Sequence, residues 1–315
     1  MRVTLDATGR VMIALVAAVM LQAPAAALEQ IPEHRAKQIR EAVPAEPQVP
    51  PKQGRRVLVW VTPPHLMPKD PHKGYNIPYA AVAMKMLGTK TGAFEAVVSD
   101  DLSVWAPKSL DRFDAVVLCN ASQNWITPSD ESMEKLRALG DTKEAVAEVL
   151  KKTFLDWVRA GRGVMAFHYA IGANRKWPAF HEMLGATVAG HPWHEEVGIT
   201  VEEPGHPLLA AFGGKKTFRL TEEIFQFLDP YSRRRLRVLL SIDTAATNME
   251  VKWLRRKDDN DYALAWVKPY GKGRVFYTAI GHRTEHFWNP MILRFYLAGI
   301  QFATGDLDAP AEPRK

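Results

Sequence analysis

The sequence predicts an α/β protein with a flavodoxin-like, doubly wound and mostly parallel sheet, helices on both faces and a strand-rich C-terminal half. Two observations lead to this fold class. In the first half, short continuous apolar runs alternate with segments of helical period, as in chains that join parallel strands through crossover helices. In the second half, strand-like runs follow one another with few helical segments between them.

The predicted elements follow from these patterns. Apolar runs closed by proline, glycine or polar residues predict parallel strands at 56–62, 94–99, 113–120 and 163–167. Amphipathic segments predict helices at 77–87, which would end at Gly88, and at 144–160, which would end at Gly161. Further strands are predicted at 198–203, 236–243, 262–267 and 274–279, before a closing helix at 289–302.

The N-terminus has the pattern of a secretory signal peptide. Arg2 and Arg10 precede an apolar run, 11–21, that is too short to span a bilayer, and a small-residue stretch ends at Ala27. We predict cleavage after Ala27, a periplasmic or secreted location, and no membrane anchor after cleavage. The predicted segments are a signal peptide (1–27), a Pro-rich leader with a short helix (28–54), an α/β domain (55–305) and a flexible tail (306–315).

Composition excludes several classes of function. The 315 residues include 41 Lys and Arg against 35 Asp and Glu, a mild excess without the basic and aromatic motifs of a nucleic-acid module, so we expect no nucleic-acid partner. Cys119 is the single cysteine, which excludes an internal disulfide and a Cys-rich metal site; we expect it to be buried in a strand. Phosphate-loop, dinucleotide and HExxH zinc motifs are absent from the sequence.

Polar side chains, imidazoles above all, follow the predicted parallel strands. His65 and His72 follow the first strand, Asn120 the third, His168 the fourth and His282 the last. Ligands of open α/β sheets bind beyond the carboxyl ends of the strands, so we expect these groups to converge there. Imidazole is a common metal ligand and also titrates near neutral pH, which makes the convergence chemically informative.

Several motifs occur in a fixed order over about 55–305: GRGVMAFH (161–168), LG (184–185), GHP (190–192), GHPL (205–208), TEEIF (221–225) and GKGRVFYTAIGH (271–282). This ordered set resembles the ThuA-like (trehalose utilisation) family, whose fold is similar to that of class I glutamine amidotransferases. Phe225 stands where that family usually has tyrosine, and His72, with His65 as the alternative, is the counterpart of its first histidine. The strand that ends at a nucleophilic cysteine in the amidotransferases ends here at His168, which excludes glutamine hydrolysis by a Cys–His pair.

We predict a metal-assisted active site for a sugar-like substrate. Its catalytic residues are expected to be His168, His282 and Glu223. A divalent ion, Zn or Mn, is expected to bind among His72, His168, His191, His282 and Glu222, with a position left open for water. Sugar-binding residues are expected to be Tyr169, Asn120, Trp193 and Trp125. The family resemblance implies metabolism of a disaccharide or keto-sugar by hydrolysis or lyase cleavage.

Two other classes of function stay open. The protein could be a non-catalytic periplasmic carbohydrate-binding or sensing protein, or an interaction module that docks a partner through its Pro-rich leader and basic face. A homo-oligomer is compatible with the sequence. His181, His194 and His206 are interpreted as structural or loop residues, and the arginines at 233–237 as a solvated turn.

Overall fold

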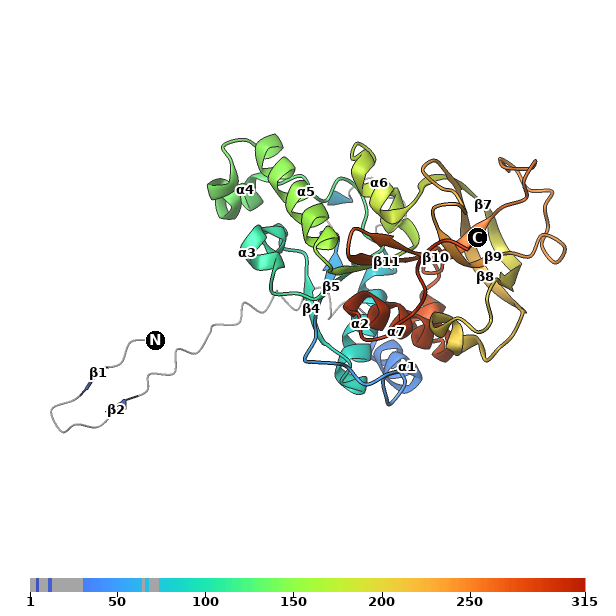
Figure 1. Ribbon diagram of the computed structural model, residues 1–315, viewed down its shortest axis with the longest axis horizontal. Coiled ribbons are helices and arrows are strands. Elements are labelled where there is room, and N and C mark those ends of the chain that lie inside the picture. The colour runs from blue at the N-terminus through green and yellow to red at the C-terminus, as the bar shows by residue number, and fades with distance from the viewer. Residues whose placement is uncertain (1–3, 6–10, 13–30, 64–65, 68–73, 315) are drawn as a thin grey trace.

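A nine-stranded mixed sheet organises the protein, as seen in a computed structural model that describes residues 4–5, 11–12, 31–63, 66–67 and 74–314 (Figure 1). Five neighbouring strands are parallel: β4 (Glu95–Ser99), β3 (Arg56–Val61), β5 (Ala115–Cys119), β6 (Gly163–Phe167) and β11 (Gly273–Thr278). The sheet continues with antiparallel strands β10 (Ala263–Tyr270), β9 (Arg237–Ile242), β7 (Thr187–Val201) and β8 (Thr217–Leu228). The predicted α/β class is therefore confirmed.

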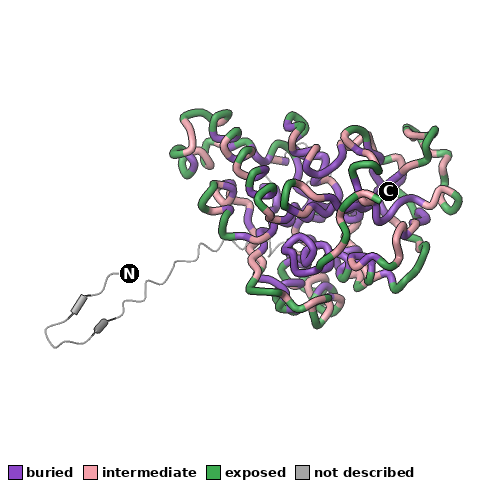
Figure 2. Tube along the Cα trace, viewed as in Figure 1, coloured by how far each residue is buried: buried purple, intermediate pink, exposed green. Residues whose placement is uncertain are grey.

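Helices cover the parallel strands on two sides (Figure 1). On one side α2 (Ile77–Thr91) and α7 (Pro290–Thr304) pack against the sheet, and on the other side lie α5 (Lys143–Arg159) and α6 (Pro178–Leu184). Every residue of β5 and of β6 is buried, as their continuous apolar runs predict (Figure 2). The layers therefore leave the strand ends as the place where polar side chains can gather.

The remaining elements are short or peripheral. They are β1 (Thr4–Leu5), β2 (Val11–Met12), α1 (Glu33–Ala42), α3 (Pro107–Leu110), α4 (Asp130–Leu136) and the 3₁₀ helices η3 (Leu102–Trp105), η4 (Arg137–Leu139), η5 (His168–Gly172), η6 (Pro207–Phe212) and η7 (Thr284–Trp288). β1 pairs with β2 as a separate antiparallel ladder. The predicted cleavage site at Ala27 lies outside the described residues. Within the described part of the chain, no helix has both the length and the apolar content needed to cross a bilayer.

Two predicted boundaries were wrong. Helix α2 continues past Gly88 to Thr91, and Gly92 with φ +69° forms its C-cap. A Cβ at Gly88 would lie 2.5 Å from the Phe94 carbonyl oxygen, so Gly88 permits close packing rather than ending the helix. Strand β7 begins at Thr187 rather than at 198. Its partner β8 was not predicted, because its sequence mixes apolar and charged residues and breaks the pattern of a buried strand.

The leader and the C-terminal segment pack against the α/β body. The short helix expected in the leader is α1, whereas the C-terminal segment that we expected to be a flexible tail is packed. Ile39 of α1 is buried in the core, and the Gln48 backbone N–H donates to Gln301 Oε1 at 2.9 Å. Asp306, whose side chain is fully buried, binds the Arg55 guanidinium. The Pro310 carbonyl oxygen lies 2.9 Å from Nε2 of His206, the N-cap residue of η6. These contacts make the described parts of both segments a component of the fold.

Candidate functional site

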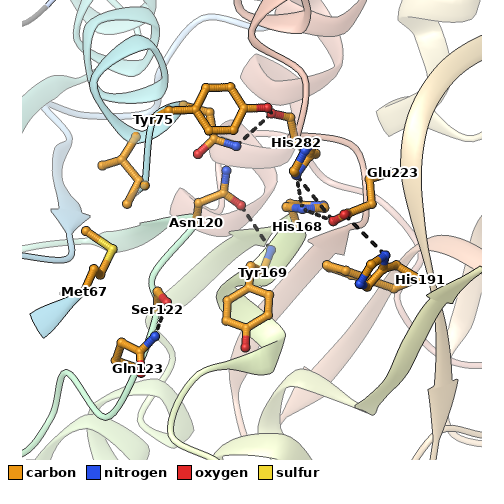
Figure 3. A pocket seen from close by; sticks show the side chains of 14 residues that line it. Met67, Tyr75, Asn120, Ser122, Gln123, His168, Tyr169, His191, Glu223 and His282 are labelled. Atoms are coloured by element: carbon orange, nitrogen blue, oxygen red, sulfur yellow. Dashed lines mark hydrogen bonds and ion pairs between the residues drawn. The ribbon is translucent and has the colours of Figure 1, made fainter. Parts of the chain in front are cut away.

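A cavity of about 310 Å³ lies at the carboxyl edge of the parallel strands (Figure 3). Its walls come from the segments that follow β3, β5, β6 and β11, and from the β7–β8 hairpin. The lining residues are Met67, Gly74, Tyr75, Asn76, Ile77, Asn120, Ser122, Gln123, His168, Tyr169, His191, Glu223, Phe225 and His282. This volume lies at the lower end of the range of roughly 300–1,000 Å³ typical of small-molecule sites.

The three residues predicted to be catalytic meet at one side of this cavity (Figure 3). Glu223 Oε2 lies 3.2 Å from His168 Nε2 and 3.3 Å from His282 Nδ1. The two imidazole nitrogens are 3.2 Å apart. One ligand atom from each of the three side chains lies within 4.8 Å of the other two. The expected convergence of imidazoles from separate strand ends therefore holds for His168 and His282.

Local structure orients His168. Its backbone has φ +48°, a left-handed conformation that turns the chain directly after β6, and Asn120 adopts φ +46° directly after β5. Such strained backbone is characteristic of functional sites. His168 Nδ1 lies 3.0 Å from the Ala279 carbonyl oxygen, which can only accept, so Nδ1 carries the proton. Nε2 is then the ring nitrogen that faces Glu223, and it is the nitrogen through which His168 would bind a metal ion.

The carboxylate of this cluster is Glu223. The expectation that Glu222 binds the metal does not hold, because its side chain does not face the cavity. Consecutive side chains of a strand point to opposite faces, so only one of the two glutamates on β8 can face the cavity. Glu223 does so together with Phe225, whose ring stacks on His168 at a centroid distance of 4.4 Å. Glu222 is fully buried, and its oxygens accept hydrogen bonds from backbone amides beneath the cavity.

Burial and charge set the protonation states of the cluster. Burial alone would raise the pKa of Glu223, but the hydrogen bond and charge of His168, with smaller contributions from His282 and His191, lower this pKa to about 2. Burial and the neighbouring His168 lower the pKa of His282 to about 4, against the opposite effect of the two glutamates. At neutral pH the cluster thus offers a carboxylate and a neutral imidazole, both of which are cation ligands.

Two further histidines of β7 lie near the cluster. His191, a predicted ligand, has a half-exposed side chain, and its Nδ1 lies 3.4 Å from Glu223 Oε1. The ring of His194, which we interpreted as a loop residue, lies 5.1 Å from that of His282. His65 and His72, the alternative counterparts of the family's first histidine, lie outside the described residues.

Other histidines and charged residues have structural roles. His206 caps η6 and contacts Pro310, and His181 is buried in α6, in keeping with their interpretation as structural residues. The arginines at 233–235 lie in an exposed turn, as expected. Three arginines of this region also form ion pairs: Arg233 with Glu202 and Asp261, Arg235 with Glu182, and Arg237 with Glu203. Cys119 is buried in β5, as expected.

Of the predicted sugar-binding residues, Asn120 and Tyr169 line the cavity. Asn120 accepts a hydrogen bond from the Tyr169 backbone N–H at 3.0 Å and donates from Nδ2 to the Gly281 carbonyl at 2.8 Å. Trp125 and Trp193 are buried away from this cavity, contrary to expectation. Trp125 packs against two other tryptophans, and Trp193 donates its indole N–H to the Asn248 carbonyl. Their large apolar area is used in the core, which a sequence pattern does not distinguish from a binding surface.

Sequence reasoning missed the segment before α2. The Tyr75 hydroxyl and the Asn76 side-chain amide both donate to the His282 carbonyl oxygen at 2.8 Å. It also missed His286 of η7, whose Nε2 lies 3.0 Å from Glu222 Oε2. No motif marks Tyr75 or Asn76. His286 could have been noticed because it follows His282 of the Gly281-His282 motif by four positions.

Together these features define an α/β protein with an imidazole–carboxylate cluster at the carboxyl edge of its parallel strands. The ThuA family, described as trehalose utilisation, matches residues 56–303, and the chain belongs to that family. The resemblance of its ordered motifs is thereby confirmed. Membership in this family suggests a role in carbohydrate utilisation.

Two solved structures share the fold. A ThuA-like protein from Bacteroides uniformis is 17% identical, with a TM-score of 0.57, over 82% of this chain and 93% of that chain. A ThuA-like protein from Parabacteroides merdae is 16% identical, with a TM-score of 0.53, over 82% and 93% of the two chains. At these identities the likeness establishes the fold alone. A search of curated proteins finds no match.

Proposed function

We propose that the protein is a secreted or periplasmic, metal-assisted enzyme that cleaves a disaccharide or keto-sugar by hydrolysis or by a lyase reaction. The observation that carries this proposal is the meeting of His168, Glu223 and His282 at the cavity. For the fold, the strand order β4-β3-β5-β6-β11 in the parallel half supports the flavodoxin-like assignment.

The donor set fits a divalent ion. Two imidazole nitrogens and one carboxylate oxygen are ligands of catalytic zinc sites, which keep a further position open for water or substrate. The same donors suit Mn²⁺. A metal ligand must be an unprotonated nitrogen, and in His168 this would be Nε2, because Nδ1 donates to the Ala279 carbonyl. A bound divalent ion would acidify a water molecule or polarise a sugar oxygen.

The chain's own residues would bind the sugar and move protons. Tyr169 offers a flat apolar face of the kind that stacks on sugar rings, and Phe225, Met67 and Ile77 contribute to the apolar wall. His191 is half-exposed beside the second oxygen of Glu223, so its imidazole is placed to exchange a proton between the cavity and solvent. Glu223 would hold the cation through the oxygen that faces both buried imidazoles.

Metal analysis tests this function. Protein purified without chelator is expected to hold a stoichiometric divalent ion in plasma emission analysis, and His168→Ala and His282→Ala are expected to lose it. His34→Ala, at an exposed position of α1, is the matched control and should keep the ion. Full occupancy in both cluster variants would place the metal elsewhere and overturn the proposal.

A non-catalytic carbohydrate-binding or sensing protein is the second candidate, because the apolar and aromatic cavity walls suit a sugar without any metal. Calorimetry with glucose and trehalose, before and after chelation, separates the two. Sugar binding that survives chelation, with no sugar consumed by the metal-loaded protein, would favour the binding protein. The proposed location is tested by the mass of the exported protein, which should begin at Leu28.

A further inference from the structure

A buried carboxylate lies directly beneath the loop that carries His282. Glu222 has no exposed surface. Its Oε2 accepts from the backbone N–H groups of Gly281 at 2.9 Å and His282 at 3.3 Å, and its Oε1 accepts from Arg283 at 3.3 Å. Oε1 also accepts from the Glu223 N–H at 2.7 Å. One side chain thus binds three consecutive amides of the 281–283 loop and the amide of the neighbouring glutamate.

A buried imidazole supports this carboxylate from below. His286 of η7 places Nε2 3.0 Å from Glu222 Oε2, and both side chains are almost completely buried. Burying a carboxylate is costly unless it has polar partners, and here four backbone amides donate to it while the His286 imidazole lies against it. This buried carboxylate belongs to the residue next to Glu223, a member of the imidazole–carboxylate cluster.

The carbonyl groups of the same loop accept hydrogen bonds from two asparagine side chains. Asn120 and Asn76 donate their side-chain amides to the Gly281 oxygen at 2.8 and 3.1 Å, and Asn76 also donates to the His282 oxygen. Gly281 has φ +150°, and a Cβ there would lie 2.8 Å from the Phe167 ring. The loop is therefore held by acceptors at its N–H groups, by donors at its oxygens and by close packing against β6.

We propose that Glu222 is a positioning residue: by binding the amides of the 281–283 loop it keeps His282 Nδ1 within reach of the cation that Glu223 and His168 would hold. The metal readout of this inference rests on the proposed function. A carboxylate suits the role because it only accepts hydrogen bonds and has lone pairs for four amides. Glutamine has nearly the same shape, but its NH₂ group would face backbone N–H groups and leave some of them unpaired.

The first test is Zn²⁺ affinity, measured by calorimetry on folded protein. Glu222→Gln is expected to weaken Zn²⁺ binding by about 10–100-fold, the usual effect of losing an outer partner of a metal ligand. Glu285→Gln is the matched control, because Glu285 belongs to the same region and its half-exposed carboxylate pairs with Arg283. That control should keep wild-type affinity. Equal affinity in wild-type and Glu222→Gln protein would overturn the inference.

The second test needs no metal. In metal-free protein, Glu222→Gln should speed hydrogen exchange at the amides of 281–283 by more than its loss of global stability explains, as judged from urea unfolding. Absence of that local effect would reduce Glu222 to an ordinary core residue and overturn the positioning role. If wild-type protein binds no Zn²⁺ but the exchange effect appears, the proposed function fails while the loop's dependence on Glu222 stands.

A shorter acid covers the case in which Glu222→Gln does not fold. Glu222→Asp keeps the negative charge but withdraws it by one methylene, so it reaches fewer of the four amides. It is expected to show both effects at smaller size. Wild-type exchange and Zn²⁺ affinity in Glu222→Asp, together with loss of folding in Glu222→Gln, would mean that only the charge matters and would contradict positioning by hydrogen bonds.

Discussion

Replacing Asp306 by alanine should destabilise the protein more than any other change in the C-terminal segment. Its side chain is fully buried, and it accepts hydrogen bonds from the Arg55 guanidinium at 2.6 and 2.9 Å and from the Lys52 backbone N–H at 3.0 Å. The Thr304 hydroxyl lies 3.0 Å from its second oxygen. Asp306→Ala would remove the group that ties the leader and the end of α7 to each other.

The magnitude follows from what the substitution leaves behind. Removing one partner of a buried ion pair costs about 3–5 kcal/mol, because the other charge stays buried without compensation. Arg55, with a side chain only 11% exposed, would keep Asp114 at 3.5 Å. The lower end of the range therefore applies, and we expect a loss of about 3 kcal/mol in the free energy of unfolding.

Urea unfolding at pH 7 measures this loss, with Asp308→Ala as the matched control. Asp308 pairs with Lys52, but its side chain is 81% exposed, so its loss should cost only about 0–1 kcal/mol. Equal effects of the two substitutions would refute the claim that the C-terminal segment belongs to the folded body.

The pH dependence has a defined sign. Burial would raise the pKa of Asp306, but the hydrogen bond from Arg55, with those from Lys52 and Thr304, lowers it below its ordinary value. A carboxylate whose pKa is lower in the folded state stabilises the fold above its unfolded pKa of about 3.9, and this stabilisation is lost as the pH falls through the folded value. The difference between wild-type and Asp306→Ala protein should therefore shrink in acid.

Three further predictions concern other parts of the fold. Burial lowers the pKa of Lys268 to about 8, so the unfolded protein binds more protons than the folded protein between about pH 8 and 10.4. The free energy of unfolding should therefore rise over this range by up to about 3 kcal/mol, and Lys268→Met should abolish that rise in urea titrations at several pH values. Gly281→Ala should lower the free energy of unfolding by about 2–4 kcal/mol through backbone strain and the clash with Phe167. Gly205→Ala, where nothing lies within 4 Å of the added Cβ, should be nearly neutral in thermal unfolding. Trp125→Ala should cost about 3–5 kcal/mol yet leave the sugar affinity of the folded protein unchanged; a selective loss of sugar binding would return this residue to the site.

Local pattern was sufficient for the parallel half of the sheet. The run at 163–167 predicted β6 with its observed bounds, because a strand buried on both faces needs an uninterrupted apolar sequence. The rule that polar groups beyond parallel strands share one edge then predicted that His168 and His282 lie together. Both conclusions depend only on the period and position of residues along the chain.

Side-chain direction could not be obtained in the same way. Glu222 and Glu223 are adjacent and chemically identical, and β8 was not predicted, so no pattern could say which carboxylate faces the cavity. Trp125 and Trp193 illustrate the same limit, since a large aromatic residue satisfies a core and a sugar site equally well. The packing of the leader through Lys52 and Asp306 joins residues far apart in sequence, which no local period encodes.

The amino-acid sequence by itself determined the α/β class, the parallel strands, the family and the imidazoles at the strand ends, because each follows from local periodicity or ordered motifs. Only the tertiary structure decided which glutamate joins His168 and His282, which tryptophans belong to the core, and that the described leader and C-terminal segment pack on the body. The choice of glutamate depends on how β7 and β8 lie over the strand ends, and the other outcomes depend on contacts between segments far apart in the sequence. Contact between distant segments is a property of three-dimensional packing.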